Sequence, residues 1–186
     1  MDIIKKMRCL SIFLIIIFSI ISFACADNQE VFIPIDRISD EGKIYTIEDF
    51  KSIGFKKSSE YNVEQLPEAT SAFFGFIKNE IGESEDYEIR FYATHNGAVE
   101  FGTKYADNIV GEDACVKKDC SLWLENLNQR QQIDGGPSIM ESMAGTRNPK
   151  YKNYVIYNNL ILFCPGNDEN DSLKKCTVVI QKLSNL

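Results

Sequence analysis

The residues of this chain that could carry out chemistry are few and lie far apart. His95 is the only histidine, and it stands in the short polar segment Thr94–Gly97. Catalysis by a histidine requires a partner within hydrogen-bond reach, and acidic candidates are Glu100 and Asp107. A lone histidine in such a segment is more often a turn or capping residue, and no Gly-x-Ser-x-Gly, His-Glu-x-x-His or phosphate-loop motif occurs. We therefore expect no catalytic residue, with a small hydrolase-like enzyme centred on His95 as the alternative function.

Four cysteines beyond the first 25 residues form a second group: Cys115, Cys120, Cys164 and Cys176. In an exported protein an even number of cysteines predicts disulfide bonds, for which three connectivities exist here. We favour Cys115–Cys120 and Cys164–Cys176, because each pair is close in sequence and flanks a turn. The four residues between Cys115 and Cys120 do not match the redox spacing of two, and no histidine lies nearby to complete a zinc site.

The segment Asn167–Asp171 offers oxygen ligands at alternating positions, as a calcium loop does, but it lacks the full loop pattern and a downstream bidentate glutamate. A solvated turn followed by a helix cap is the simpler interpretation. The sequence therefore predicts no metal site and no cofactor.

The N-terminal segment has the composition of an export signal. Three basic residues, Lys5, Lys6 and Arg8, precede Leu10–Cys25, a run of apolar residues interrupted only by serines. This order is typical of a signal peptide, which would occupy residues 1–26. An uncleaved membrane anchor is the least favoured interpretation, since a spanning helix requires ~20 apolar residues.

The end of the apolar run allows two cleavage routes. Ala24 followed by Cys25 resembles the lipobox of bacterial lipoproteins. This resemblance implies cleavage before Cys25, lipidation of its thiol, and an acyl anchor in the lipid bilayer of the cell envelope. Ala24 and Ala26 also form an Ala-x-Ala cleavage site, which would release a secreted or periplasmic protein that begins at Asp27.

The remaining residues, 27–186, are expected to form a single domain large enough to bury its own core, with residues 27–45 as a possible tether. The whole chain has a formal charge of −7, and loss of residues 1–26 removes three basic residues and one acidic residue, which leaves −9. Nucleic acid is therefore not expected as a partner, because its phosphates repel an acidic protein.

Apolar periodicity predicts the same order of elements twice, a hairpin followed by a helix. The elements are expected at residues 71–78, 87–93 and 98–110, and again at 154–157, 160–164 and 171–183. Two ββα-like units predict an α+β fold, a two-layer sandwich in which an antiparallel sheet carries its helices mainly on one face. Shorter elements are expected as a strand at 31–35, helices after Thr46 and at 121–130, and a loop at 131–149.

The sheet face that the helices leave free is the predicted binding site. Strand alternation places aromatic residues and one cation on it: Phe74, Phe76, Arg90, Tyr92 and Tyr157. Left uncovered, such a surface would bind a ligand. The alternative is that Trp123, Leu127 and the 131–149 loop cover this face, in which case the loop acts as a lid over a pocket. The predicted function is a non-catalytic binding or interaction module of the cell envelope, with an unknown ligand or envelope protein as its partner.

Overall fold

One six-stranded sheet organises the structure, with strand order β1-β7-β8-β4-β3-β2. The computed structural model describes residues 32–111, 113–134 and 146–186, and Pro34–Leu186 form one compact unit. The strands of this sheet are β1 (Ile38–Ser39), β2 (Lys56–Tyr61), β3 (Ala69–Lys78), β4 (Ser84–Tyr92), β7 (Tyr151–Tyr157) and β8 (Leu160–Pro165). Two further strands, β5 (Gln131–Asp134) and β6 (Thr146–Pro149), pair with each other in the region expected to be a loop.

Turn chemistry accounts for the two central hairpins. The β3–β4 turn contains Gly82 with a φ of 84°, a conformation that glycine adopts without steric cost. The β7–β8 turn is Asn158 and Asn159, as predicted, and Asn158 has a φ of 50°, which asparagine tolerates. Among the described strands of this sheet only β1 runs parallel to its neighbour, so the sheet is mixed rather than purely antiparallel.

Capping residues set where helices α2 and α6 begin. Helix α2 (Ile47–Ser52) begins after Thr46, whose side chain forms a capping box with Asp49. Helix α6 (Glu169–Ser184) begins after Asp168, whose carboxylate accepts a hydrogen bond from the backbone N–H of Asp171. The sequence predicts Asp171 or Ser172 as the cap of the final helix, but the cap is Asp168, so the helix starts earlier than predicted.

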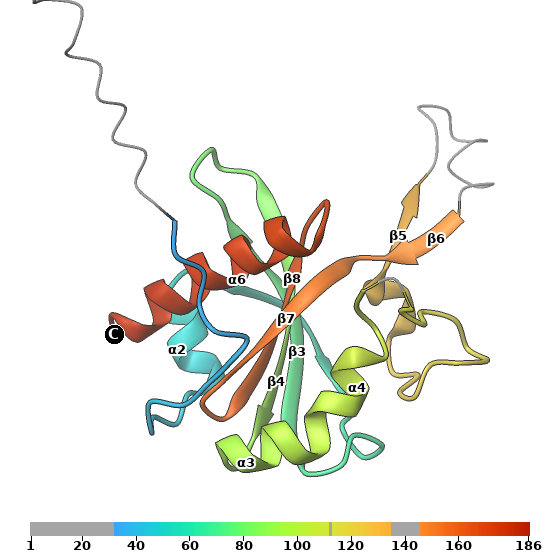
Figure 1. Cartoon of the computed structure of the whole chain (residues 1–186), viewed down its shortest axis with the longest axis horizontal. Coiled ribbons are helices and arrows are strands. Elements are labelled where there is room, and N and C mark those ends of the chain that lie inside the picture. Colours follow the sequence, from blue (N-terminus) through green and yellow to red (C-terminus); the bar gives the residue numbers. More distant parts are fainter. Residues whose placement is uncertain (1–31, 112, 135–145) are drawn as a thin grey trace, which may run out of the picture. The chain divides into compact units, whose positions relative to one another are not determined.

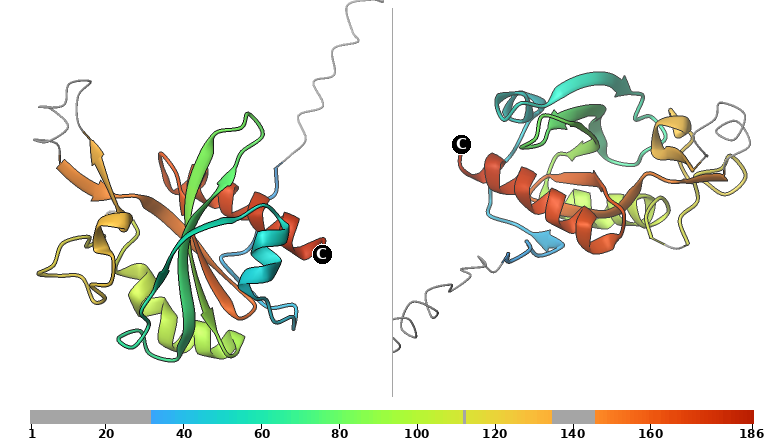
Figure 2. Two further views of the ribbon diagram at one scale, coloured as in Figure 1. Left: turned by 180° about the vertical axis from the view of Figure 1, so that it is seen from behind. Right: turned by 90° about the horizontal axis from the view of Figure 1, so that it is seen from above.

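The helical elements lie on both faces of the sheet. Helices α2 and α6 share a core with Leu162 of β8, whereas the next residue, Phe163, packs in a second core with Ala106 of α4 (Thr103–Asp107). Adjacent strand residues point to opposite faces, so the two helical groups are separated by the sheet. Figures 1 and 2 show α2 and α6 on one side and the segment of α3 (His95–Gly97) and α4 on the other. The mixed α and β structure is as predicted, but the placement of the helices mainly on one face is wrong.

The segment from α3 to α4 packs small residues against the sheet, as the spacing of Ala98, Gly102 and Ala106 in the sequence predicts. Between the two helices lies a π-helical turn, η2 (Ala98–Gly102), which shifts the side-chain register. The same periodicity predicts an apolar stripe of Phe101, Tyr105 and Ile109, but Phe101 is 38% exposed. Gly102 faces the sheet. A Cβ atom on Gly102 would lie 2.4 Å from Cδ1 of Ile161, so the close approach of helix and sheet requires glycine here.

Several shorter elements differ from expectation. The predicted strand at 31–35 is absent from its described part, and β1 lies a few residues later; β2 falls in a polar segment for which no strand was predicted. The helix at 121–130 is reduced to the 3₁₀ turn η3 (Leu127–Arg130). Residues 34–45 belong to the compact unit rather than to a free tether, since the N–H of Ile35 donates to Oγ1 of Thr177 at 3.0 Å. Residues 135–145 of the predicted loop and the whole predicted signal peptide lie outside the described residues.

The helices in the described ranges are all too short or too polar to cross a membrane.

Candidate functional site

The five residues predicted to form a binding surface do not share one open face. Arg90 and Tyr92 of β4 are 0% and 1% exposed, and Phe74 and Phe76 of β3 are half-buried on the same side. Tyr157 lies on the opposite face, in the core of α2 and α6, where it stacks on the ring of another tyrosine. The side that carries Arg90 is covered by an additional layer, which was the alternative considered for this face.

The covering layer is held by two buried arginines. The guanidinium carbon of Arg90 lies 4.3 Å from the ring centroid of Phe163 and 4.9 Å from that of Trp123. That of Arg130 lies 4.2 Å from the ring centroid of Trp123 and 5.2 Å from that of Tyr61. The alternation Phe163, Arg90, Trp123, Arg130, Tyr61 forms a cation–aromatic ladder, which fixes the segment of Trp123 and Arg130 on the sheet.

Glu88 joins the two cations of the ladder. Its Oε1 accepts a hydrogen bond from Nε of Arg90 and its Oε2 accepts one from Nε of Arg130, each at 2.7 Å. Burial alone would raise the pKa of Glu88, but the two guanidinium groups outweigh burial and hold that pKa below its usual range. Burial lowers the pKa of Arg90. Trp123 adds an acceptor, because its carbonyl oxygen binds Nη1 of Arg130 at 3.2 Å.

The charged groups of the ladder are shielded from solvent by the described residues, because Glu88, Arg90 and Arg130 are each 0% exposed and Trp123 is 3% exposed. Its arrangement is that of a structural cluster. Neither Glu88 nor Arg130 was singled out in the sequence. For Glu88, the signal was its position two residues before Arg90 on the same strand face; for Arg130, no local pattern points to the sheet.

His95 is committed to a turn. Its Nδ1 lies 2.8 Å from the carbonyl oxygen of Asn158, so this nitrogen donates to the β7–β8 turn. Of the two acids named with it, Asp107 accepts hydrogen bonds from Arg37 and from the hydroxyl of Tyr154. No described carboxylate, Glu100 included, forms an ion pair with His95. The structure does not assemble the hydrolase-like set.

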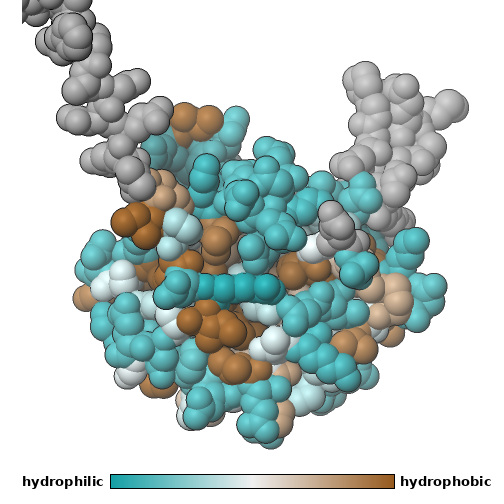
Figure 3. All heavy atoms as spheres, in the orientation of Figure 1, coloured by the Kyte–Doolittle hydropathy of each residue, from teal (hydrophilic) through white to brown (hydrophobic). Residues whose placement is uncertain are grey.

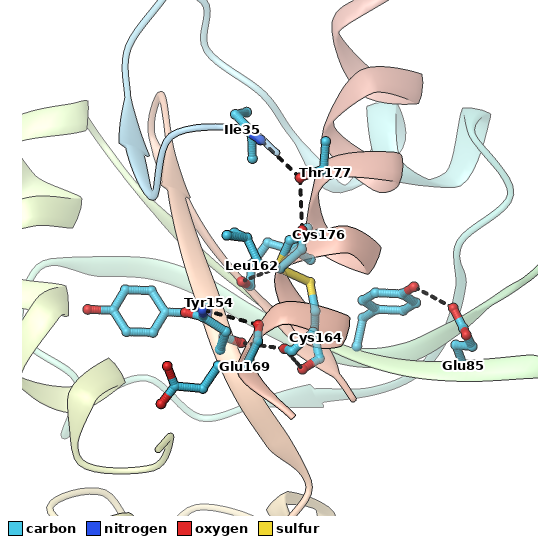
Figure 4. The surroundings of a disulfide bond; sticks show 12 residues. Ile35, Glu85, Tyr154, Leu162, Cys164, Glu169, Cys176 and Thr177 are labelled. Carbon is cyan, nitrogen blue, oxygen red and sulfur yellow. Dashed lines mark hydrogen bonds between the residues drawn. A yellow bond between two sulfur atoms is a disulfide. The ribbon is translucent and has the colours of Figure 1, made fainter. Parts of the chain in front are cut away.

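Two disulfide bonds are present, Cys115–Cys120 and Cys164–Cys176, with the predicted pairing. Disulfides of this kind persist in an oxidising compartment and therefore indicate a location outside the cytosol. Figure 4 shows that Cys164–Cys176 links β8 directly to α6. Within the described ranges, no group of three or more histidine, cysteine, aspartate or glutamate side chains is placed to hold a metal ion.

Helix α6 and the β3–β4 hairpin enclose a groove of about 400 Å³, which we call the hairpin–helix groove. Its floor is apolar and buried, formed by Ile77, Tyr87 and Val179. Its rim contains exposed apolar side chains, because Ile81 is 79% exposed and Val178 is 38% exposed. Figure 3 shows a small hydrophobic patch at the outer end of this hairpin, with hydrophilic surface around it.

Polar contacts close one side of the groove. The hydroxyl of Tyr87 donates to Oε2 of Glu85 at 2.9 Å (Figure 4), and burial together with Glu85 raises the pKa of Tyr87. Glu85 also pairs with Nζ of Lys175 at 3.1 Å, which joins the hairpin to α6. The hairpin wall is therefore attached to the helix by an ion pair, and the helix to the sheet by a disulfide.

The other cations of the groove are unpaired. Lys78 lies on the hairpin wall, and Lys174 and Lys182 lie on the helix wall. None of the three forms an ion pair with an acidic residue of the described chain. The groove thus combines an apolar floor with three ammonium groups that no carboxylate neutralises by contact. None of its residues was predicted as a site, since they come from two distant segments of the sequence.

A comparison with protein families matches residues 46–185 of the chain, which include the groove, the ladder and both disulfides. No curated protein and no solved structure is similar enough to match. The match covers most of the chain. The protein therefore belongs to the family of unknown function DUF6810.

Proposed function

We propose that this protein is an exported, non-catalytic binding module of the cell envelope, held at the membrane by a lipid on Cys25. The ligand site in this proposal is the hairpin–helix groove. A secreted form that begins at Asp27 would have the same site without the anchor.

The observation that carries the proposal is the groove's apolar character. Small-molecule sites are concave, mostly apolar and about 300–1,000 Å³ in volume, and the groove has about 400 Å³. Ile81 and Val178 expose apolar surface directly beside this hollow. Covering that surface with an apolar ligand releases water and favours binding.

The walls of the groove also support the proposal, because they are held in place before a ligand binds. Cys164–Cys176 ties α6 to β8, and the ion pair of Lys175 with Glu85 ties α6 to the hairpin. A site that is already formed avoids the entropy cost of ordering its walls during binding.

The test uses a neutral apolar fluorescent probe, N-phenyl-1-naphthylamine, with the disulfide-bonded exported protein carrying Cys25→Ser. This substitution removes any acyl chain of the protein's own that could occupy the groove. We expect saturable fluorescence enhancement, and we expect Val178→Asp to lower probe affinity at least tenfold because it places a carboxylate on the apolar rim.

The matched control is Leu122→Asp. Leu122 is 43% exposed, close to the exposure of Val178, and does not line the groove, so probe affinity should be unchanged. Far-UV circular dichroism and thermal unfolding must show that both variants are folded. An unaltered affinity in Val178→Asp, or an equal loss in Leu122→Asp, would refute the groove as the site.

The anchor is tested by the intact mass of the exported wild-type protein. A diacylated chain that begins at Cys25 supports the proposed anchor. A chain that begins at Asp27 rejects it and leaves a soluble exported module.

A further inference from the structure

We infer that the hairpin–helix groove binds an anionic amphiphile, a single acyl chain that ends in a carboxylate. This inference rests on the proposed function and adds the ligand's charge and shape to it. The chain is to lie on the apolar floor, with the carboxylate among the unpaired lysines.

The charge of the groove is opposite to that of the protein. The chain has 27 acidic and 20 basic residues, yet four lysines line the groove against two glutamates, Glu80 and Glu85. Glu85 is already paired with Lys175. A local excess of cations on an acidic protein attracts a negatively charged ligand and excludes a positively charged one.

The unpaired lysines stand on both walls of the groove, where the carboxylate of a bound ligand would contact them. Lys174, Val178 and Lys182 recur at intervals of four residues, so they form one row along α6 with Val178 in the middle. Lys78 stands on the opposite wall. Lysine stems lie along apolar surface while the ammonium groups stay in water, so these cations can hold a charged head at the mouth of the groove without leaving solvent.

A bilayer surface fits the same region less well. The turn between β3 and β4 carries Glu80 and Glu83 on either side of Ile81 and Gly82, and both glutamates are exposed. An extended anionic surface that approached the lysines would also approach these two carboxylates, and the carboxylates would repel it. A single small head between the two walls avoids them, which favours a free fatty acid over a membrane.

The test compares three ligands with the same chain length: dodecanoate and dodecyltrimethylammonium below their critical micelle concentrations, and dodecanol below its solubility limit. Displacement of N-phenyl-1-naphthylamine from the oxidised Cys25→Ser protein gives the affinities. We expect dodecanoate to bind at least tenfold more tightly than the other two, with an advantage that shrinks as salt is raised from 20 to 500 mM, because salt screens charge.

Variants locate the effect. The double variant Lys174→Gln/Lys182→Gln should lower dodecanoate affinity about tenfold and leave the affinity of the neutral probe unchanged. The control Lys117→Gln/Lys118→Gln removes the same charge from the exposed Cys115–Cys120 loop and should change neither. An equal loss in the control would mean that net charge, and not the groove, sets the preference, and would overturn the inference.

The outcomes also separate this inference from the proposed function. Probe binding with no preference for dodecanoate refutes the anionic ligand and leaves the binding module intact. Absence of probe binding refutes both. Binding to anionic phospholipid vesicles without displacement by dodecanoate would assign the lysines to a membrane surface and overturn the inference.

Discussion

Removal of the negative charge from the cation–aromatic ladder should be the most damaging single change in the core. In Glu88→Gln the side chain keeps its size, so no cavity forms, but one acceptor oxygen becomes an NH2 group that faces a guanidinium donor, and both guanidinium groups lose the negative charge that they share. The buried charge of Glu88, Arg90 and Arg130 then rises from one positive unit to two. Breaking a buried ion pair costs about 3–5 kcal/mol, and we expect the upper part of this range.

The comparison with Arg130→Ala distinguishes charge from packing. This variant removes more atoms, two ring contacts and the bond to Trp123, but it leaves Glu88 paired with Arg90 and the cluster neutral. We therefore expect a smaller loss of stability, about 3 kcal/mol. A model in which stability follows the number of lost contacts predicts the reverse order.

Urea unfolding at pH 7 measures both variants, because Trp123 is the only tryptophan and lies within the ladder, so its fluorescence reports the cluster directly. Lys51→Ala serves as the control, since its ion pair with Glu48 is exposed and such pairs contribute less than about 0.5 kcal/mol. A loss below about 1 kcal/mol in Glu88→Gln, or a loss smaller than in Arg130→Ala, would refute the charge argument.

Three further outcomes follow from the structure. The pKa of Glu88 in the folded protein lies below its ordinary value of 4.5. Its contribution to stability is therefore fully present above pH 4.5 and is lost as pH falls through the folded pKa, so the free energy of unfolding in urea should fall more steeply in this range for wild type than for Glu88→Gln. Burial raises the pKa of Tyr92 to about 12, so stability should fall as pH rises from 10 towards 12. The protein has eight tyrosines, so the tyrosinate absorbance of Tyr92 is taken as the difference between wild type and Tyr92→Phe, and a difference that appears near pH 10 would contradict the buried position. Gly102→Ala should lower the free energy of unfolding by about 1–3 kcal/mol through overpacking against Ile161, and an unchanged thermal midpoint would contradict the close approach.

The elements predicted correctly were those in which local pattern and tertiary packing agree. The β7–β8 hairpin combines apolar strands with an Asn158–Asn159 turn, and α2 has a capping residue at Thr46, so short segments carried enough information. Strand β2 was missed because it is an edge strand with mostly exposed, polar residues. Its pairing with β3 supplies the hydrogen bonds that fix it, and such pairing leaves no apolar period in the sequence.

The placement of the helices could have been inferred from one strand. Residues 160–164 are apolar at every position, and a strand with two apolar faces requires cover on both. In the expected two-layer arrangement, helices cover only one face of this strand. The candidate groove had no comparable signal, because Lys78 and Lys174 are almost a hundred residues apart and become neighbours of one hollow only through the packing of α6 against the sheet.

The protein uses its two kinds of cation in opposite ways, and this decides which of them can serve a ligand. Arg90 is stacked between rings and bound to Glu88, an environment that suits the weakly hydrated, planar guanidinium group. A ligand could reach it only by displacing Trp123 and breaking the buried ion pair. Lys174 and Lys182 keep strongly hydrated ammonium groups beside an apolar floor, and neither forms an ion pair with a carboxylate of the described residues. The lysines of the groove can therefore form ion pairs with an anionic ligand. The arginines of the ladder already form theirs with Glu88 and stabilise the fold.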